Sequence, residues 1–357
     1  MIGKFARGYS AIPNPLPDDA FVFLVSPSAE ILLSQRDGTL HIPTVVDLNF
    51  LLQIQQLPIR PIYLGKIGQQ ICIADTISAA VKTTILGDAS AKWRFEPIRS
   101  ARSLLDEDVY TCVWLSQHLT AWNESSRFCG YCGAGMAFTT DSSGTWCKKC
   151  TSPACLSPFV FPRTNPCIIA SIIRLPDAEC PHPRILLSRS RARPLFFSVN
   201  AGFVEACEPL EGAVTREIQE EVGLQVRNIQ YFGSTSWAPS CSLMVAYTTE
   251  YAGGELRPDG EEIECAYWLT ADEIQADLAL TESATPPPPD MVRPAPGGKT
   301  RPLIRLPMKW SISRMLVDAF MHPEQHSRMC RGEQAARLLA LAPHVGLVAP
   351  MAHTATL

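Results

Sequence analysis

The first third of the chain carries short apolar runs broken by turn residues, which is the pattern of strands. Phe21–Val25 and Ile31–Leu33 have strand length and are separated by a Ser-Pro-Ser turn. A second pair of runs, Ile62–Leu64 and Gln70–Ile73, flanks two glycines and predicts a hairpin. From Ser103 onward, apolar residues recur at helical spacing. We therefore expect a β-rich N-terminal domain that ends in a helix.

The second half of the chain alternates between strand and helix patterns. Strands are expected at Cys167–Ile173 and Ile185–Ser188. The apolar spacing then predicts a helix over Pro209–Val222, which Gly223 stops. The later expected elements are strands at Ile229–Phe232, Leu243–Tyr251 and Cys265–Leu269 and a helix at Ser311–Phe320. Such alternation is typical of a mixed sheet flanked by helices, so the predicted fold class is α+β.

Proline and glycine interrupt this alternation in one segment. Residues 285–302 are rich in proline and contain Gly297-Gly298, which predicts an extended, mobile insertion rather than packed structure. The expected parts of the chain are a β-rich domain at 1–125, a cysteine-rich segment at 126–162, the alternating domain with its insertion at 163–320, and a tail at 321–357.

Composition and charge narrow the class of protein. The 357 residues are 46% hydrophobic and 18% charged, a balance typical of a globular protein. The net charge of −4 excludes a polycation held on nucleic acid by bulk charge alone. The sequence has no apolar run of membrane-spanning length, and its start lacks the apolar core of a signal peptide. Because His353–Leu357 is not a Ser-Lys-Leu peroxisomal signal, we expect a cytoplasmic protein with no membrane partner.

Four of the thirteen cysteines have the spacing of a zinc ribbon. Cys129-x2-Cys132 and Cys147-x2-Cys150 can each form a tight turn, so that four thiolates bind one Zn²⁺ tetrahedrally. Such a closed site is structural, because it leaves no position for a substrate. Cys155 follows five residues after Cys150 and could replace it as the fourth ligand.

The predicted helix before Gly223 carries a cluster of acidic residues. Glu217, Glu220 and Glu221 occupy positions i, i+3 and i+4, so their carboxylates share one flank of the helix. Like charges near a helix C-terminus repel one another and the helix dipole. Mg²⁺ or Mn²⁺ would turn this repulsion into coordination, since hard cations prefer oxygen ligands. A merely solvated acidic face would leave the fixed offsets of the surrounding glycines, Glu208 and Arg216 unexplained.

The segment Gly202-x5-Glu208-x7-Arg216-Glu217-Ile-Gln-Glu220-Glu221-Val-Gly223 resembles the Nudix box at every defined position. With the cysteine-rich segment, Phe161-Pro-Arg and Ala201-Gly-Phe-Val-Glu, the chain is similar to the NADH diphosphatase, or NudC-type, family. The resemblance covers Arg127–Leu269 and resumes at Ser311–Leu316. It implies a Nudix α/β/α sandwich with a mixed sheet, preceded by a zinc ribbon and a Nudix-like β-rich domain. It also implies a homodimer.

The resemblance further implies which residues act. The catalytic Mg²⁺ or Mn²⁺ would be bound by the backbone carbonyl of Ala201 and by the carboxylates of Glu217, Glu221 and Glu262. Glu261 is the alternative to Glu262. Glu220 would be a further ligand or would help to polarise the attacking water.

The substrate site is where the sequence departs from the family. The family signature Ser-Gln-Pro-Trp-Pro-Phe-Pro-x-Ser marks a preference for the nicotinamide dinucleotide, and here Ser234–Ser242 reads Ser-Thr-Ser-Trp-Ala-Pro-Ser-Cys-Ser. We expect this loop to lie over the substrate, with Phe161 stacked on its base and Ser313 near the pocket. The substrate-binding residues predicted in the loop are Ser234, Thr235, Ser236, Trp237, Ala238, Pro239, Ser240, Cys241 and Ser242.

The resemblance implies metal-dependent hydrolysis of the diphosphate of NAD(H)-like dinucleotides to AMP and nicotinamide mononucleotide. An NAD-capped RNA presents the same bond and is a second expected substrate. The alternatives are another Nudix substrate such as ADP-ribose, or an inactive zinc-ribbon adaptor, against which the complete glutamate set argues. The ribbon has few basic residues (Lys148, Lys149, Arg163), so a structural clasp is favoured over a nucleic-acid finger.

Overall fold

The computed structural model describes residues 5–6, 15–36, 38–48, 62–87, 93–140, 146–156, 159–178, 180–283, 285, 287–288, 290–295 and 299–323. These residues form two compact units, which are described separately. The first contains the residues up to Arg163 together with Ala238–Cys241, and the second contains Thr164–Trp237 and the residues from Ser242 onward. The predicted tail, apart from its first residues, lies outside the described residues. Among the described helices, none has both the length and the hydropathy that a membrane crossing needs.

The first unit is built on a seven-stranded sheet with the order β1-β5-β6-β2-β3-β4, in which β7 also pairs with β3. Its strands are β1 (Phe5–Ala6), β2 (Phe21–Val25), β3 (Glu30–Arg36), β4 (Thr39–His41), β5 (Ile62–Ile67), β6 (Gln70–Thr76) and β7 (Trp93–Pro97). The helices are α2 (Ala79–Gly87), the short η1 (Ser100–Ser103) and α3 (Glu107–Ser125). The predicted strands, the β5–β6 hairpin and the helix after Ser103 are confirmed.

A small antiparallel hairpin, β8 (Met136–Thr140) and β9 (Trp146–Cys150), follows α3. Lys148 of β9 is 2% exposed, and its Nζ donates hydrogen bonds to the carbonyls of Asn123 and Ser126 at 2.9 and 3.1 Å. These carbonyls lie at the C-terminal end of α3, where backbone acceptors lack helical partners. Burial lowers the pKa of Lys148. Lys148 therefore fixes the hairpin to the helix and is not an exposed cation.

The second unit contains a six-stranded sheet with the order β13-β14-β10-β11-β15, in which β12 also pairs with β10. Its strands are β10 (Asn165–Arg174), β11 (Arg184–Ser190), β12 (Asn200–Phe203), β13 (Gln225–Trp237), β14 (Ser242–Gly253) and β15 (Ile263–Leu269). Its helices are α4 (Leu210–Val222), α5 (Ala271–Thr281) and α6 (Ile312–Met321), with η2 (Ala238–Ser240) between β13 and β14.

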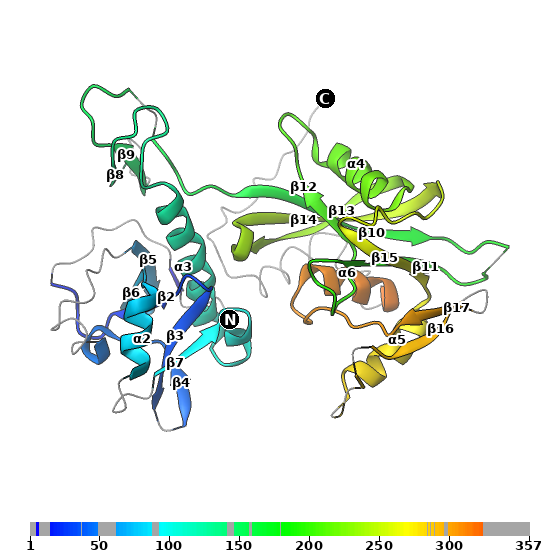
Figure 1. Cartoon of the computed structure of the whole chain (residues 1–357), viewed down its shortest axis with the longest axis horizontal. Coiled ribbons are helices and arrows are strands. Elements are labelled where there is room, and N and C mark those ends of the chain that lie inside the picture. Colours follow the sequence, from blue (N-terminus) through cyan, green and yellow to red (C-terminus); the bar gives the residue numbers. More distant parts are fainter. Residues whose placement is uncertain are drawn as a thin grey trace, which may run out of the picture. The chain divides into compact units, whose positions relative to one another are not determined.

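Helices cover both faces of this sheet (Figure 1). Side chains alternate along β10, so that Ile168 and Ile172 pack in the cluster under α4, whereas Ile169 packs in the cluster with α5 and α6. The sheet is mixed, because β10 pairs parallel with β14 and antiparallel with β11. The predicted α/β/α sandwich is confirmed.

The prediction that the proline-rich insertion lacks packed structure is wrong for the residues that the structure describes. β16 (Val292–Ala295) and β17 (Lys299–Pro302) form an antiparallel hairpin. Asp277 of α5 is fully buried, and its carboxylate accepts from Arg301 Nη1 at 2.5 Å and lies 3.0 Å from Arg293 Nε. The prediction considered the prolines of this segment and overlooked Arg293 and Arg301, whose side chains contact the buried carboxylate of Asp277. Helix α5 was also missed, although its Thr270-x2-Glu273 capping box is visible in the sequence.

Asp277→Ala should destabilise the protein by roughly 3–5 kcal/mol, because it leaves the guanidinium of Arg301, 3% exposed, without its partner. Arg293 has a side chain that is 33% exposed, so Arg293→Ala should cost about 1 kcal/mol or less. Urea unfolding of the two variants measures the difference. Equal losses would show that the buried ion pair does not hold the hairpin.

Candidate active site

Helix α4 presents its acidic residues beside the sheet because its opposite flank is apolar. Ala213, Val214, Ile218 and Val222 are buried in the cluster with β10. The helix ends at Gly223, whose φ of 73° is the left-handed conformation that glycine adopts most easily. The carboxylates near this end therefore lie on the flank that borders β12.

Gly202 of β12 makes room for one of these carboxylates. A Cβ atom on Gly202 would lie 1.9 Å from Cδ of Glu217. Any side chain at this position would therefore displace Glu217. The missing Cβ places the Glu217 carboxylate directly against the backbone that follows Ala201, whose carbonyl is the fourth predicted metal ligand.

Arg216 holds the loop before α4 to the helix. Its Nε and Nη2 donate to the two carboxylate oxygens of Glu208 at 2.8 and 2.9 Å, and Nη2 also donates to the carbonyl of Phe203 at 2.8 Å. This contact lowers the pKa of Glu208 to about 2. Nη1 lies 3.1 Å from Glu217 and 2.9 Å from Glu220. The guanidinium of Arg216 thus binds Glu208 with two hydrogen bonds and also contacts Glu217 and Glu220, which explains the fixed spacing of Glu208 and Arg216 in the sequence.

Glu221 is the most buried carboxylate of the cluster, with 6% of its surface exposed. Burial, together with the negative charges of Glu217, Glu262 and Asp259, raises its pKa to about 8, against one hydrogen bond from Asn200 that lowers it. Burial also raises the pKa of Glu217, and Glu220 and Glu262 add to the shift. The carboxylates of Glu217 and Glu221 therefore lie where burial disfavours their charge, and a bound cation would favour the ionised form of both.

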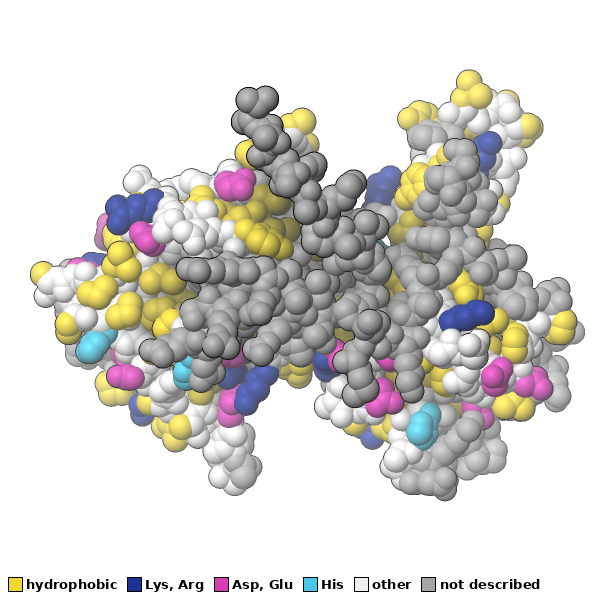
Figure 2. Space-filling view, turned by 180° about the vertical axis from the view of Figure 1, so that it is seen from behind, with side chains coloured by type: hydrophobic (Ala, Val, Ile, Leu, Met, Phe, Trp, Pro, Cys, Tyr) yellow, Lys and Arg dark blue, Asp and Glu magenta, His cyan; other side chains and the backbone are white. Residues whose placement is uncertain are grey.

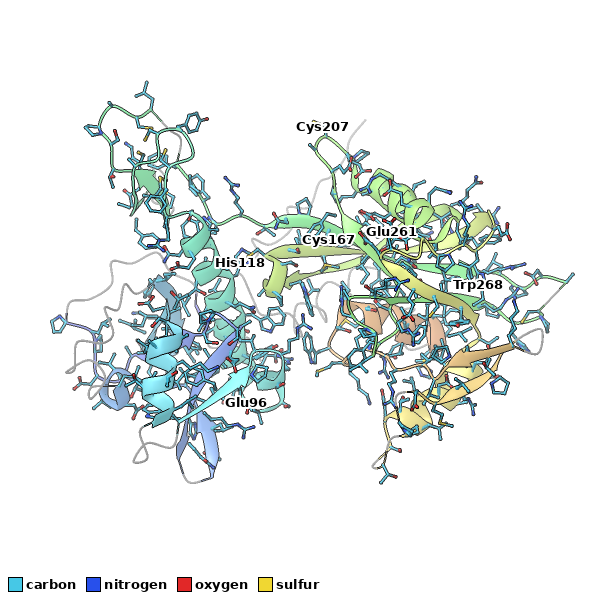
Figure 3. All side chains as sticks on the ribbon, viewed as in Figure 1. Glu96, His118, Cys167, Cys207, Glu261 and Trp268 are labelled. Atoms are coloured by element: carbon cyan, nitrogen blue, oxygen red, sulfur yellow. The ribbon has the colours of Figure 1, made fainter. Side chains whose placement is uncertain are left out.

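The loop before β15 supplies the third carboxylate. Asp259 accepts hydrogen bonds from the backbone N–H groups of Glu262 and Ile263, at 3.2 and 2.8 Å to Oδ1. Glu262, rather than its neighbour Glu261 (labelled in Figure 3), is the residue whose charge acts on Glu217 and Glu221. The assignment of Glu262 rather than Glu261 as a metal ligand stays a prediction.

Cys167 of β10, also labelled in Figure 3, lies near the same carboxylates. Burial and the charges of Glu217 and Glu221 raise the pKa of its thiol to about 12. A thiol with such a pKa stays protonated at neutral pH and cannot serve as a nucleophile.

The donor set fits a hard divalent cation. The glutamates provide oxygen ligands, and the close fit of Glu217 against Gly202 holds one of them in place. Among the described residues, however, the glutamate oxygens do not converge within 4.8 Å of one another as four cysteine sulfurs do. Mutual repulsion of like charges opposes a closer approach.

Asn200 contacts the acidic cluster, which the sequence did not reveal. Its Nδ2 donates to Glu221 Oε2 at 2.7 Å, and its Oδ1 accepts from the hydroxyl of Ser188 at 3.1 Å. Asn200 and Ser188 are each 2% exposed. The hydroxyl fixes the amide orientation, and the amide fixes one oxygen of Glu221. A polar residue between apolar neighbours before Ala201-Gly202 was the available signal.

Asn200→Leu should therefore weaken Mn²⁺ binding roughly 10- to 100-fold, since residues that orient metal ligands typically contribute that much. Ser188→Ala keeps the side-chain amide of Asn200 and should weaken Mn²⁺ binding less than Asn200→Leu does. Titration of free Mn²⁺ by electron paramagnetic resonance measures this without substrate. Unchanged binding in Asn200→Leu would show that Glu221 needs no orienting partner.

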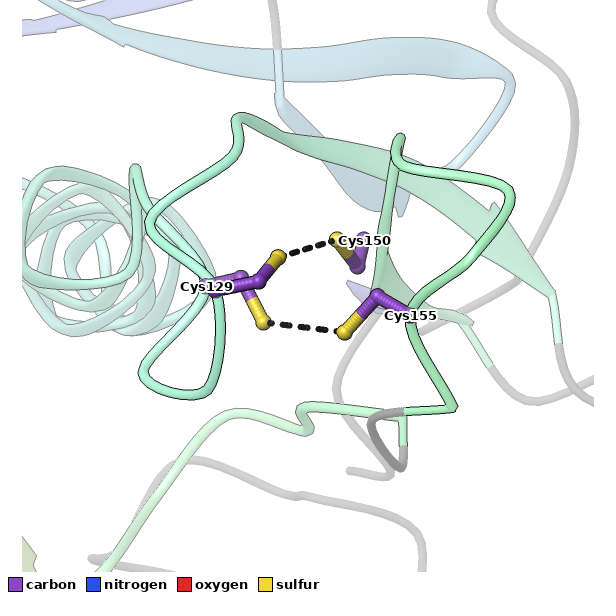
Figure 4. Close-up of side chains that lie close together, drawn as sticks. Cys129, Cys150 and Cys155 are labelled. Carbon is purple, nitrogen blue, oxygen red and sulfur yellow. Dashed lines mark hydrogen bonds between the residues drawn. The ribbon is translucent and has the colours of Figure 1, made fainter.

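The cysteine cluster differs from the predicted quartet in one member. The sulfurs of Cys129, Cys132, Cys150 and Cys155 lie within 4.8 Å of one another, with 3.8 Å between Cys129 and Cys155 and 3.5 Å between Cys132 and Cys150 (Figure 4). Cys147 is fully buried and does not belong to this group. Cys155 therefore replaces Cys147, and not Cys150 as the sequence suggested.

Strand geometry explains the replacement. Cys147 and Cys150 both lie in β9, and residues three apart on a strand point to opposite faces. Cys129 and Cys132 lie instead in a tight turn, in which the backbone carbonyl of Cys129 accepts a hydrogen bond from the N–H of Gly133. Both thiols can therefore point to the same side. The second turn follows β9, where the N–H of Ser152 lies 3.4 Å from the sulfur of Cys150.

The predicted substrate loop is a tight hairpin, not an open loop. Ser234–Trp237 ends β13 and pairs with Ser242–Val245 of β14. Where the family signature has proline, Ser236 keeps an N–H that a strand pairing can use. The ring of Trp237 lies 6.4 Å from that of Trp310, centroid to centroid. Aromatic surface is therefore retained at this end of the hairpin.

The other two predicted substrate residues differ in exposure. Ser313 is 6% exposed, and its hydroxyl lies 2.8 Å from that of Ser198, so it joins α6 to the strand region and does not face solvent. Phe161 is 40% exposed and belongs to the first unit. Its ring remains available for stacking.

Comparison with known proteins identifies the family of the chain. The NUDIX domain family model matches residues 170–290. The NAD-capped RNA hydrolase NudC of Deinococcus radiodurans is 36% identical over 215 residues, which are 60% of this chain and 70% of that protein. The proteins of the same name from Photobacterium profundum and Pectobacterium carotovorum are 34% and 36% identical, and the matches cover 48% and 49% of this chain and 60% and 64% of those proteins. This chain thus spans less than two thirds of either.

Among solved structures, a NUDIX hydrolase from Nitrosomonas europaea is 21% identical and matches 40% of this chain and 77% of its own, with a TM-score of 0.31. The chain belongs to the Nudix hydrolases and, among them, to the NudC-type family with a zinc ribbon.

Proposed function

We propose that the chain hydrolyses the diphosphate bond of NAD(H)-like dinucleotides, free or as the 5′ cap of an RNA, to AMP (or a 5′-monophosphate RNA) and nicotinamide mononucleotide. The observation that carries the proposal is the Glu217 carboxylate packed against Gly202, together with the negative charge of Glu262, which adds to the burial that raises the pKa of both Glu217 and Glu221. The names of the NudC relatives support NAD-capped RNA as a substrate.

The residues of the cluster would divide the work. Glu217, Glu221, Glu262 and the carbonyl of Ala201 would hold Mg²⁺ or Mn²⁺, which when bound neutralises the diphosphate and lowers the pKa of the attacking water. Arg216 keeps Glu217 and Glu220 oriented. The Glu220 side chain is 60% exposed, so it can accept a proton from that water and pass it to solvent.

The cysteine cluster would bind a structural Zn²⁺. Four thiolates from two tight turns complete a tetrahedral site without an open position. The family resemblance also supports a homodimer, which sedimentation analysis of the full chain would test.

A Mg²⁺-dependent screen over NADH, NAD, ADP-ribose, diadenosine polyphosphates and NAD-capped RNA tests the function. We expect turnover of NAD(H) and of capped RNA, with release of nicotinamide mononucleotide. Activity confined to ADP-ribose would assign the chain to another Nudix substrate class. A protein that leaves every compound intact would be an inactive adaptor.

A further inference from the structure

The zinc ribbon has two unlike faces, which the strand register separates. Phe138 pairs with Lys148 of β9, and Lys148 pairs with Val160, so these three residues share the face turned to α3. Neighbouring residues on a strand point to opposite faces. Lys149 and Phe159 therefore belong to the other face.

Phe128 lies on this second face as well. Phe128 pairs with Gly135, and Lys149 pairs with Ala137. Gly135 and Ala137 are two residues apart, so they and their partners point to the same face. Phe128 is 67% exposed and Phe159 37% exposed. Two aromatic rings thus reach solvent on one side of the hairpin.

A cation lies over each ring. The guanidinium of Arg127 is 5.9 Å from the centroid of Phe128, and Nζ of Lys149 is 5.5 Å from that of Phe159. Arg127 also lies 3.6 Å from Glu124, but both side chains are exposed, and such a pair contributes little. Both cations therefore remain available to an anion.

The charge of the segment points to a polyanion. Residues 127–163 contain Asp141 as their one acidic residue, against four Lys and Arg, although the whole chain carries a net charge of −4. Lys148 is buried, so the positive charge beside the two rings comes from Lys149, which lies on the second face, and from the Arg127 guanidinium, which lies over the Phe128 ring. In Figure 2, hydrophobic side chains with Lys or Arg among them lie exposed over the ribbon.

We propose that this face, the ribbon platform (Arg127, Phe128, Lys149 and Phe159), binds single-stranded RNA, the polymer to which the proposed substrate cap is attached. Bases stack on exposed rings, and cations beside them contact the phosphates. A duplex keeps its bases stacked inside and offers no ring face to such a platform. The core of a protein interface is instead depleted of charged residues.

This proposal rests on the proposed function and gives capped RNA an advantage over free dinucleotides that the glutamate site cannot provide.

The test uses the full chain with Phe128→Leu/Lys149→Ala. Relative to wild type, kcat/KM for NAD-capped RNA should fall roughly tenfold or more, and so should the affinity for an uncapped 5′-phosphate RNA, while kcat/KM for NADH stays unchanged. Phe128→Trp keeps a ring and should retain RNA binding, which Phe128→Leu loses. Arg94→Ala, an exposed cation on β7, is the matched control.

Three results would overturn the platform. RNA affinity could be unchanged in the double variant, activity on NADH and capped RNA could fall together, or sedimentation could show that the variant changes oligomeric state, which would make this face a protein interface. Failure of the proposed function is distinct, since wild-type protein would then cleave no dinucleotide while RNA affinity still reports on the platform.

Discussion

Glu221→Gln should lower kcat by roughly 10²- to 10³-fold at saturating Mg²⁺, with the fold intact. The variant removes the negative charge of Glu221, the most buried carboxylate of the proposed ligand set, but keeps its shape and its hydrogen bond from Asn200. Metal-bound water and a neutralised diphosphate are together worth several kcal/mol of barrier, and each 1.36 kcal/mol is tenfold in rate. Steady-state kinetics on the best substrate of the screen measures the loss.

Although Glu221→Gln should lower kcat, it should raise the thermal stability of the metal-free protein. Burial raises the pKa of Glu221 from 4.5 to about 8, so the metal-free native state resists ionisation and loses stability as pH rises from about 4.5 toward 8. In EDTA, Glu221→Gln should therefore melt at a higher temperature than wild type at pH 8 and at a similar temperature at pH 5. Glu220→Gln, at an exposed position, should leave melting unchanged. A melting temperature at pH 8 that falls together with kcat would attribute the loss to unfolding.

The sequence predicted those parts of the fold that local patterns determine. The apolar strands β2, β3, β5, β6, β10, β11 and β13–β15 were predicted from their runs, and α4 from its period and its stop at Gly223, whereas β1, β4, β7 and β12 were missed. The Nudix box could be located because its residues are close in sequence. Glu262 could be placed only by counting back from Trp268, and its role as a ligand stays a prediction, although its charge acts on Glu217.

What escaped the sequence depends on contacts between distant residues. Asn200 meets Glu221 across β12 and α4, and Asp277 meets Arg293 and Arg301 across a segment whose prolines suggested no structure. Lys148 was counted among the basic residues of the ribbon, yet its Nζ is buried and donates a hydrogen bond to a backbone carbonyl at the C-terminal end of α3. None of these partners is within one helical turn of the other, so no periodicity could reveal them.

The cysteines give the second large expected effect. Cys155→Ala should abolish stoichiometric zinc binding, whereas Cys147→Ala should retain about one zinc per chain. If burial alone decided the loss of stability, Cys147→Ala would be the more destabilising variant, because Cys147 is fully buried and Cys155 is only half-buried. A structural zinc contributes roughly 10–16 kcal/mol to the folding of small zinc domains, so loss of one thiolate should unfold the ribbon first.

Zinc content by atomic emission after dialysis against a mild chelator, together with thermal melting, separates the two variants. Cys147→Ala removes only a small buried side chain and should cost about 1 kcal/mol, a shift of a few degrees. Retention of zinc by Cys155→Ala with its loss from Cys147→Ala would restore the ligand set that the two Cys-x2-Cys pairs predict. Such a result would require β9 to open between Cys147 and Cys150, since one continuous strand cannot turn both thiols toward the same ion.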